Sequence, residues 1–293
     1  MKSGFISIVG RPNTGKSTLI NTIINEHIAI VSNVAGTTRN TIQGVYHDED
    51  TQIVFVDTPG IHKSMDRLGK HLNKQTYESL EDIDAILFVV DAASGLGKGD
   101  KFIIEALKHT SVPVILVLNK IDKLTKEGIL TSIQNYKDLF DFADIIPISA
   151  LRHDNIERLI EITKKYLKDN IKYYEDDVIT NNDTNFMIAE LVREKILNLT
   201  TEEVPHAITC VLTSYNEKAN IVELSVDIIV SRDSLKKIII GKKGTMLKTI
   251  GTEARKDIEA MLGKQVYLEL YVKTIKNWRN KEKYLYELGL TEK

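Results

Sequence analysis

Gly10-Arg11-Pro12-Asn13-Thr14-Gly15-Lys16-Ser17 is the stretch that decides the fold of this chain. It matches G-x-x-x-x-G-K-[ST], the pattern of a loop that wraps its backbone around phosphate groups. The apolar run Phe5–Val9 enters the loop as a predicted strand, and Thr18–Ile24 leaves it as a predicted helix. Because the pattern lies between a strand and a helix, it predicts a P-loop rather than a chance glycine turn.

Each residue type in this loop has a chemical reason. Gly10 and Gly15 remove Cβ atoms where the backbone must close around phosphate. Backbone N–H groups at the head of a helix attract an anion, and here they come from Asn13, Thr14, Gly15, Lys16, Ser17 and Thr18. The Lys16 ammonium is predicted to reach the β- and γ-phosphates, and the Ser17 hydroxyl is predicted to hold Mg²⁺.

The composition allows two globular domains. The chain has 293 residues, and one core usually serves about 100–200 residues. Cys210 is the single cysteine, which excludes an internal disulfide and suits a reducing cytosol. The N-terminus runs directly into a predicted strand, so we expect no signal peptide. We also expect no membrane span, because apolar runs such as Val112–Leu118 are far shorter than the roughly 20 residues that a membrane helix requires. These features predict a cytoplasmic protein.

Charge is distributed unevenly along the chain. From Pro205 to Lys293 there are 16 Lys and Arg against 11 Asp and Glu, a balance of +5. The rest of the chain carries 23 against 30, a balance of −7. A basic C-terminal part on an acidic body is a weak indication of nucleic-acid binding.

Strands and helices alternate over residues 1–170. After the P-loop the predicted strands are Gln43–His47, Thr51–Val56, Ala85–Val90, Val112–Leu118 and Ile145–Ile148. Predicted helices lie between or after them, near 100–109, 127–140 and 154–168. This alternation predicts a doubly wound, mostly parallel α/β sheet.

A second domain is predicted over residues 186–293, after a polar, acidic and aperiodic linker at 171–185. Its predicted elements are a helix at Phe186–Leu199, strands at His206–Ser214 and Ile221–Val230, helices at Ser234–Ile240 and Thr245–Leu262, a strand at Gln265–Lys273 and a basic final helix. The order is therefore α-β-β-α-α-β, which predicts an α+β domain.

A carboxylate and a glycine follow the predicted strand Thr51–Val56, in Asp57-Thr58-Pro59-Gly60. Asp57 is placed to hold Mg²⁺ through water, and Gly60 is placed to offer an unhindered N–H to the γ-phosphate. Alone, these four residues would also fit a surface turn.

Guanine is favoured over adenine by Asn119-Lys120-Ile121-Asp122 at the end of another strand. The Asp122 carboxylate can accept both N1–H and N2–H of guanine, whereas adenine has no donors at those positions. Unpaired buried polar groups are costly, so the discrimination could reach about 10⁴-fold. We expect Asn119 to tie this loop to the P-loop and the Lys120 stem to cover the base.

Ser149-Ala150 follows the last predicted strand of this domain and is predicted to offer an N–H to guanine O6. With it, four motifs occur in sequence order at strand ends. Together they predict a domain that binds GTP and GDP.

Ile240-Gly241-Lys242-Lys243-Gly244 forms a G-x-x-G loop between two predicted helices. In an α-β-β-α-α-β order it matches the KH domain, whose loop clamps about four single-stranded nucleotides. Lys242 and Lys243 are predicted to meet phosphates, and apolar neighbours such as Ile240 to form the floor for the bases. The next helix adds further basic candidates, Lys248, Arg255 and Lys256. A merely solvated turn is the alternative for the two loop lysines.

Taken together, these residues resemble the Era family of the translation-factor-related GTPases over nearly the whole chain. The resemblance implies a P-loop GTPase domain followed by a type II KH domain that binds RNA. It also implies that the loop around Gly36-Thr37-Thr38-Arg39 senses the nucleotide. Thr38 is then the favoured residue to meet Mg²⁺ and the γ-phosphate, with Thr37 as the alternate.

The resemblance bears on catalysis as well, where Lys16, Thr38 and Asn13 are the candidate residues. Ras-type GTPases orient the attacking water with a glutamine, but here that position is Ile61, which cannot form such a hydrogen bond. Intrinsic hydrolysis is therefore expected to be slow. In related GTPases an asparagine at the position of Asn13 helps to hold a potassium ion beside the phosphates, so K⁺ is a second cofactor hypothesis. The alternative is that Asn13 only shapes the loop.

The expected function is a GTP-hydrolysing switch that binds the 3′ region of 16S ribosomal RNA and assists maturation of the 30S subunit. The RNA identity comes from the family resemblance alone. One alternative is a metabolic or tRNA-modifying enzyme gated by GTP, and another is a signalling or membrane-associated adaptor whose KH-like domain binds protein. We expect a cytoplasmic monomer and leave a peripheral inner-membrane fraction open.

Overall fold

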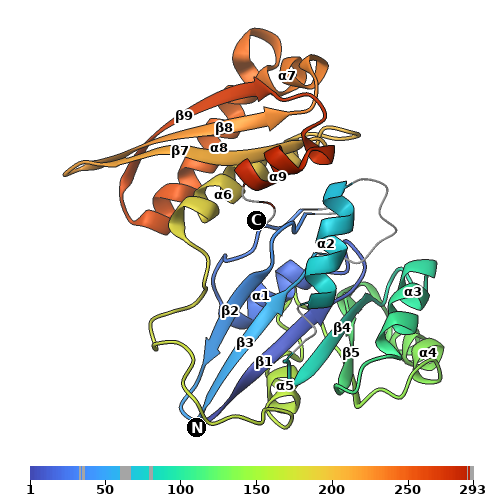
Figure 1. The fold of residues 1–293 in the computed structure, drawn as a ribbon. Helices are drawn as coiled ribbons and strands as arrows, with labels where there is room; N and C mark the ends of the chain where they lie inside the picture. The colour runs from blue at the N-terminus through green and yellow to red at the C-terminus, as the bar shows by residue number, and fades with distance from the viewer. Residues whose placement is uncertain (33, 35–36, 60–66, 79–81, 289, 291–293) are drawn as a thin grey trace. The chain divides into compact units, whose positions relative to one another are not determined.

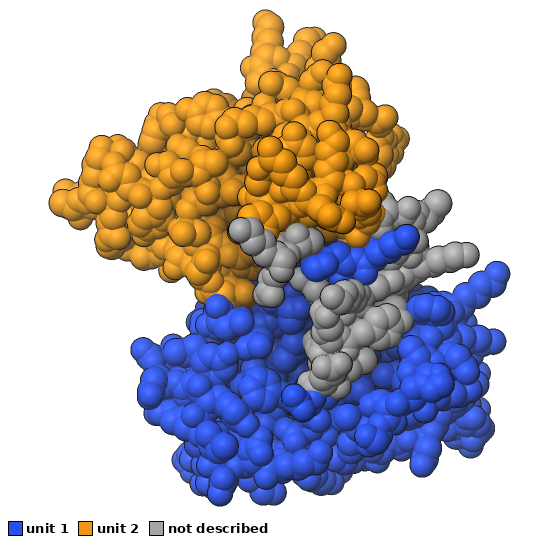
Figure 2. All heavy atoms as spheres, viewed as in Figure 1, with its two compact units in different colours: residues 1–31, 35–64, 69–181 blue, residues 32–34, 65–68, 182–293 orange. Residues whose placement is uncertain are grey.

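The computed structural model describes the whole chain except residues 33, 35–36, 60–66, 79–81, 289 and 291–293. The described chain divides into two compact units, coloured separately in Figure 2. The first comprises residues 1–31, 35–64 and 69–181, and the second comprises residues 32–34, 65–68 and 182–293. Among the described residues, no helix is both long and apolar enough to cross a membrane.

Parallel strands make up most of the sheet in the first unit (Figure 1). Within the described residues its order is β2-β3-β1-β4-β5-β6, and β2 alone runs antiparallel to its neighbour. The strands are β1 Lys2–Val9, β2 Ile42–His47, β3 Thr51–Asp57, β4 Ala85–Asp91, β5 Val114–Asn119 and β6 Asp144–Pro147. Every residue of β4 and β5 is buried, as the nearly unbroken apolar sequences of these strands require. The predicted doubly wound, mostly parallel sheet is confirmed.

Helices connect these strands and bring the connecting loops to one edge of the sheet. They are α1 Lys16–Ile24, α2 Arg67–Glu78, α3 Lys98–Leu107, α4 Lys126–Lys137 and α5 Ile156–Thr163. The chain crosses from β1 to β3 on one side and later to β4 on the other, so the order reverses at β1. Open α/β sheets bind ligands beyond the carboxyl ends of the strands at such a reversal, and the P-loop follows β1 directly.

The second unit has the predicted α-β-β-α-α-β order. Its helices are α6 Thr184–Leu199, α7 Asp233–Ile240, α8 Thr245–Leu262 and the short α9 Glu282–Glu287. Its strands are β7 Ile208–Glu217, β8 Ile221–Val230 and β9 Gln265–Thr274, with β8 antiparallel to β7 and parallel to β9. Helix α8 buries Ile250, Ala254 and Ile258, a stripe with a spacing of four residues, against this sheet.

The segment predicted as a linker, 171–185, belongs mostly to the first unit. We call its residues 171–181 the strap. Gln52 Oε1 accepts the backbone N–H groups of Tyr173 (2.7 Å) and Tyr174 (3.0 Å), and Val45 N–H donates to Ile179 O at 2.9 Å. Helix α6 already starts at Thr184, so residues 182–183 alone lie between the strap and that helix. Side-chain bonds to a distant strand leave no periodic pattern in the sequence, so these attachments could not be read from it.

Candidate functional site

The P-loop holds the Lys16 ammonium inside its own curve. Lys16 Nζ donates to the carbonyl oxygens of Gly10 and Arg11, both at 3.1 Å, and the residue is only 6% exposed. Burial lowers the pKa of Lys16, while the nearby Asp57 carboxylate opposes that shift. The predicted phosphate ligand is therefore aimed into the loop rather than into solvent.

Gly15 is required both for its conformation and for the space it leaves. It precedes α1 with φ +95°, in the left-handed region that favours glycine. A Cβ at this position would lie 2.3 Å from Asn119 Nδ2. Asn119 Nδ2 in turn donates to Thr14 O at 2.9 Å. This bond joins the loop Asn119–Asp122, which we call the guanine loop, to the P-loop as the sequence predicted.

Two hydroxyls and a carboxylate converge beside the P-loop. Ser17 Oγ lies 3.0 Å from Thr38 Oγ1 and donates to Asp57 Oδ2 at 3.0 Å, and Thr38 Oγ1 donates to the same oxygen at 3.3 Å. Within the described part of the chain, Asp57 Oδ1 is buried without a hydrogen-bond partner. Burial raises the pKa of Asp57, although Lys16, Ser17 and Thr38 all oppose the shift. Hard oxygen donors with an unsatisfied carboxylate oxygen fit a Mg²⁺ ion.

Thr38, and not Thr37, is the threonine that reaches this cluster. Thr38 is buried, whereas Thr37 is half-buried. The remaining predictions for this region concern Gly36, Gly60 and Ile61, which lie outside the described residues.

The guanine loop is fixed from both sides. Asp122 Oδ1 accepts the Ser149 hydroxyl at 2.7 Å, which ties the loop after β5 to the loop after β6. Lys120 has φ +66°, and its Nζ donates to Asn13 O at 2.5 Å and to Asp91 Oδ2 at 2.8 Å. Asp122, predicted to recognise the base, is thus positioned by neighbouring groups before any ligand binds.

The backbone N–H groups of Ser149 and Ala150, predicted as donors to guanine O6, donate to oxygen atoms of the protein itself. Ala150 N–H donates to Asn119 Oδ1 at 3.0 Å, and Ser149 N–H donates to Asp154 O at 3.1 Å. Their expected role towards guanine O6 stays a prediction, since such a contact would have to share or replace these bonds. These bonds could not be predicted, because backbone hydrogen bonds in irregular loops have no residue signature.

Asp91 is a site residue that the sequence reasoning missed. It ends β4, next to Asn119 at the end of β5, and forms the ion pair with Lys120. Although burial opposes the shift, bonds from Lys120 and Ser94 keep the pKa of Asp91 below its ordinary value. A carboxylate ending a buried strand was the available signal, as it was for Asp57.

The G-x-x-G loop of the second unit has the expected tight geometry. Gly241 has φ +72°, and a Cβ there would lie 2.7 Å from Met246 Cβ and 2.9 Å from Met246 N. Gly244 has φ +79° with open space where a Cβ would be. Lys242 and Lys243 are exposed between them, and Lys243 itself has φ +54°.

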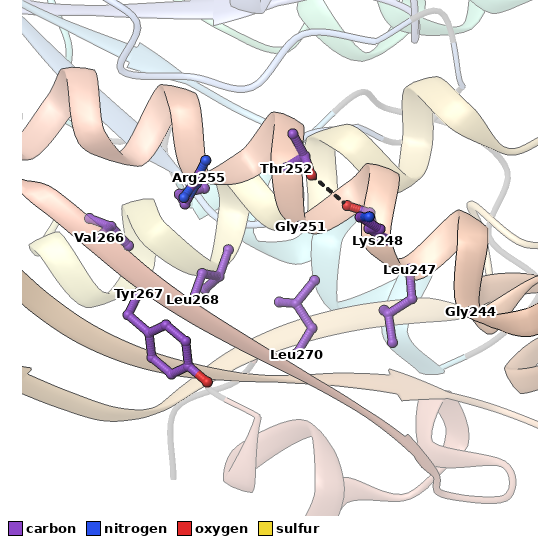
Figure 3. A pocket seen from close by; sticks show the side chains of 10 residues that line it. All are labelled: Gly244, Leu247, Lys248, Gly251, Thr252, Arg255, Val266, Tyr267, Leu268 and Leu270. Carbon is purple, nitrogen blue, oxygen red and sulfur yellow. Dashed lines mark hydrogen bonds between the residues drawn. The ribbon is translucent and has the colours of Figure 1, made fainter.

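A groove of about 460 Å³ runs from this loop along α8 and β9 (Figure 3). It is lined by Gly244, Leu247, Lys248, Gly251, Thr252, Arg255, Val266, Tyr267, Leu268 and Leu270. Leu268 and Leu270 rise from β9 towards α8, while the Tyr267 ring points to the other side of the strand (Figure 3). The groove therefore has an apolar floor and a basic rim.

The predicted RNA-contacting residues divide into two sets. Lys248 and Arg255 lie on the groove, and Lys242 and Lys243 project from the loop at its end. Ile240 packs half-buried against the hydrophobic core and does not line the groove. Lys256 also lies away from the groove, where its Nζ donates to Glu253 at 3.0 Å.

A P-loop, an oxygen cluster suited to Mg²⁺ and a guanine-type loop on a doubly wound sheet define a GTP-binding protein, and the second unit adds a KH fold. A family model described as 50S ribosome-binding GTPase matches residues 5–120, and one described as KH domain matches residues 203–279. Both matches agree with the units seen in the structure.

Solved structures match the chain over its full length. One is a tyrosine-to-alanine variant of Era from Aquifex aeolicus bound to GDP.AlF4⁻, with a TM-score of 0.96 and 40% identity, covering 100% of both chains. Another is Era in complex with MgGDPNP and nucleotides 1506–1542 of 16S ribosomal RNA, with a TM-score of 0.97, 40% identity and the same full coverage. The chain belongs to the Era family and is a GTPase, which hydrolyses GTP to GDP and phosphate.

Proposed function

We propose that this GTPase is a molecular switch whose KH unit binds the 3′ region of 16S ribosomal RNA and assists maturation of the 30S subunit. The observation that carries the proposal is the groove between α8 and β9, which starts at the G-x-x-G loop. The Era structure that holds nucleotides 1506–1542 of 16S ribosomal RNA supports this choice of RNA. We further propose that the protein acts as a monomer in the cytoplasm, where its single cysteine, Cys210, suits a reducing environment.

The nucleotide site supplies the hydrolytic half of the proposal. Ser17, Thr38 and Asp57 are the residues that would hold Mg²⁺, which neutralises charge on the phosphate oxygens when bound. Lys16 would add a positive charge at the β- and γ-phosphates. Asp122, held by Ser149, would accept the N1–H and N2–H groups of guanine.

The groove supplies the RNA-binding half. Its apolar floor of Leu247, Leu268 and Leu270 suits unstacked bases, which a duplex cannot offer. Lys248 and Arg255 lie on the rim, where a sugar–phosphate backbone would pass, and each would neutralise phosphate charge. The groove therefore favours single-stranded RNA over double-stranded RNA or protein.

A salt-dependent RNA titration tests the RNA half. The wild-type protein should bind a single-stranded 16S 3′-end RNA with an affinity that falls as salt rises. Changing Lys248→Ala and Arg255→Ala together should make the negative slope of log K against log salt less steep, by about 0.7 per lost phosphate contact. Lys256→Ala on the same helix is the matched control and should leave that slope unchanged. Binding that ignores salt would contradict the proposal and favour the adaptor alternative.

A second variant tests the groove without changing charge. A Cβ at Gly251 would lie 3.3 Å from Leu270 Cδ1, so Gly251→Leu fills the space between α8 and β9. Leucine is also a better helix former than glycine, by up to about 1 kcal/mol. We expect about tenfold weaker RNA binding, with the salt slope unchanged. Unaltered affinity would show that the bases do not enter the groove.

We also propose K⁺ as a second ion at the nucleotide site, through Asn13. This residue is exposed on the P-loop with φ +64°, and its carbonyl oxygen accepts a bond from Lys120 Nζ. Replacing potassium by sodium should slow hydrolysis in the wild-type protein but not in an Asn13→Ala variant. A wild-type rate that is indifferent to the cation would remove this hypothesis.

A further inference from the structure

The Arg11 side chain leaves the P-loop and crosses to helix α3. Arg11 Nε lies 2.7 Å from Asp100 Oδ1, and Arg11 Nη2 donates to Gly95 O at 3.3 Å. Asp100 is fully buried, in the first turn of α3. A buried carboxylate needs compensation for the loss of water, and the guanidinium provides the positive charge.

Asp100 is held in place by other partners as well. Its Oδ2 accepts Gly97 N–H at 2.8 Å and the Tyr136 hydroxyl at 3.1 Å, which comes from α4. Burial, together with the Asp100 charge, raises the pKa of Tyr136, so this hydroxyl remains protonated and available as a donor. The carboxylate is thus a fixed anchor rather than a mobile surface group.

The surface of α3 leaves room for the arginine. A Cβ at Gly97 would lie 2.6 Å from Arg11 Nη1, and a Cβ at Gly99 would lie 2.6 Å from Arg11 Cδ. A larger residue at either position would force the Arg11 side chain to shift. The glycines therefore have a packing role in seating Arg11.

The backbone of Arg11 faces the phosphate site. Its carbonyl oxygen accepts Lys16 Nζ at 3.1 Å and the Thr14 hydroxyl at 3.0 Å. The side chain of the same residue is fixed on Asp100. A rigid connection therefore runs from α3 through Arg11 to the ammonium that is aimed at the phosphates.

We propose that Arg11 is a positioning residue: anchored on Asp100, it fixes the P-loop carbonyl that aims Lys16. The inference rests on nucleotide binding at the P-loop, which GDP binding by the wild-type protein checks separately. Because Arg11 acts through Lys16, its contribution to GDP affinity should depend on Lys16 being present.

A double-mutant cycle measures that dependence. Arg11→Ala should weaken GDP binding about tenfold in the wild-type background and less than about twofold in a Lys16→Ala background, because residues that act as one unit are not additive. Asp100→Asn, which keeps the side-chain shape, should show the same non-additivity, and it serves as the test if Arg11→Ala does not fold.

Two further variants separate positioning from mere structural support. Tyr136→Phe removes a bond to the same carboxylate without touching the P-loop, so it should lower the melting temperature while leaving GDP affinity within about twofold. Arg158→Ala, an exposed arginine on α5, is the control for loss of a surface charge. Equal losses of GDP affinity in both Lys16 backgrounds, or no loss from Arg11→Ala and Asp100→Asn, would overturn the proposal.

Discussion

Asp57 ends the buried strand β3 and Asp122 lies just after the buried strand β5, yet the surroundings of these two carboxylates suit different ligands. Asp57 is fully buried beside the Lys16 ammonium and two hydroxyls, an environment for a cation. Asp122 is only half-buried, and one of its oxygens is held by Ser149. A carboxylate oriented in this way can present acceptors to the edge of a base.

Base recognition gives the first prediction. Asp122→Asn should lose GTP affinity and gain affinity for xanthosine triphosphate, because the acceptor becomes partly a donor. The change of preference should be large, up to about 10⁴-fold, since mismatched buried polar groups are costly. Competition binding with the two nucleotides measures it, and an unchanged preference would contradict the guanine assignment.

The second prediction concerns Asp57 and pH in nucleotide-free protein without Mg²⁺. Burial raises the pKa of Asp57 above its ordinary value of 3.8, so between these two pKa values the folded state binds more protons than the unfolded state. The free energy of unfolding should therefore fall as pH rises through that window, by at most about 1.4 kcal/mol per pH unit. Denaturant unfolding of wild type and Asp57→Asn across pH measures it. Parallel profiles for the two proteins would contradict the claim.

The ligand-binding residues of the sequence motifs could be predicted, but the residues that hold those motifs in place could not. Lys16, Ser17 and Asp122 have fixed spacings that reflect ligand chemistry. Asp91 pairs with Lys120 and Asp100 with Arg11, and both pairs join residues that are distant in the sequence and meet only in the folded chain. Supporting contacts of this kind have no spacing to recognise.

Regular elements followed their patterns closely, whereas the strap did not. Every residue of β4 and β5 is buried, and both strands overlap the apolar runs that predicted them. The strap has no period, and it is held by side chains such as Gln52 and Gln43 on the strands it crosses. Hydrogen bonding between an irregular segment and a strand leaves no period in the sequence, so the attachment of the strap to β2 and β3 could not be predicted.

The anchoring of the strap by Gln52 can be tested. Its side chain is almost fully buried and bonds to the backbone of Tyr173 and Tyr174. Gln52→Leu would leave those backbone groups unpaired, at a cost of about 1–3 kcal/mol in the free energy of unfolding. Amide hydrogen exchange should become faster at Tyr173 and Tyr174. The exposed Gln134 provides a control, Gln134→Leu, and exchange at the strap that is equal in both variants would contradict its anchoring role.

In the whole molecule, an acidic GTPase part precedes a basic KH part, which we propose binds RNA. A switch requires a coupling free energy between GTP binding and RNA binding. If GTP raises RNA affinity tenfold, about 1.4 kcal/mol of coupling is needed, and RNA must raise GTP affinity by the same factor. Ordering of the loop around Thr38 by the γ-phosphate is the physical event that we expect to provide it.

The most direct test is the affinity of one single-stranded 16S 3′-end RNA for the GDP-bound protein and for the protein bound to a non-hydrolysable GTP analogue. We predict about tenfold tighter RNA binding with the analogue, and an equal gain in analogue affinity when RNA is present. A Lys242→Glu, Lys243→Glu variant should lose both gains while binding the nucleotide normally. Equal RNA affinities in the two nucleotide states would contradict the switch.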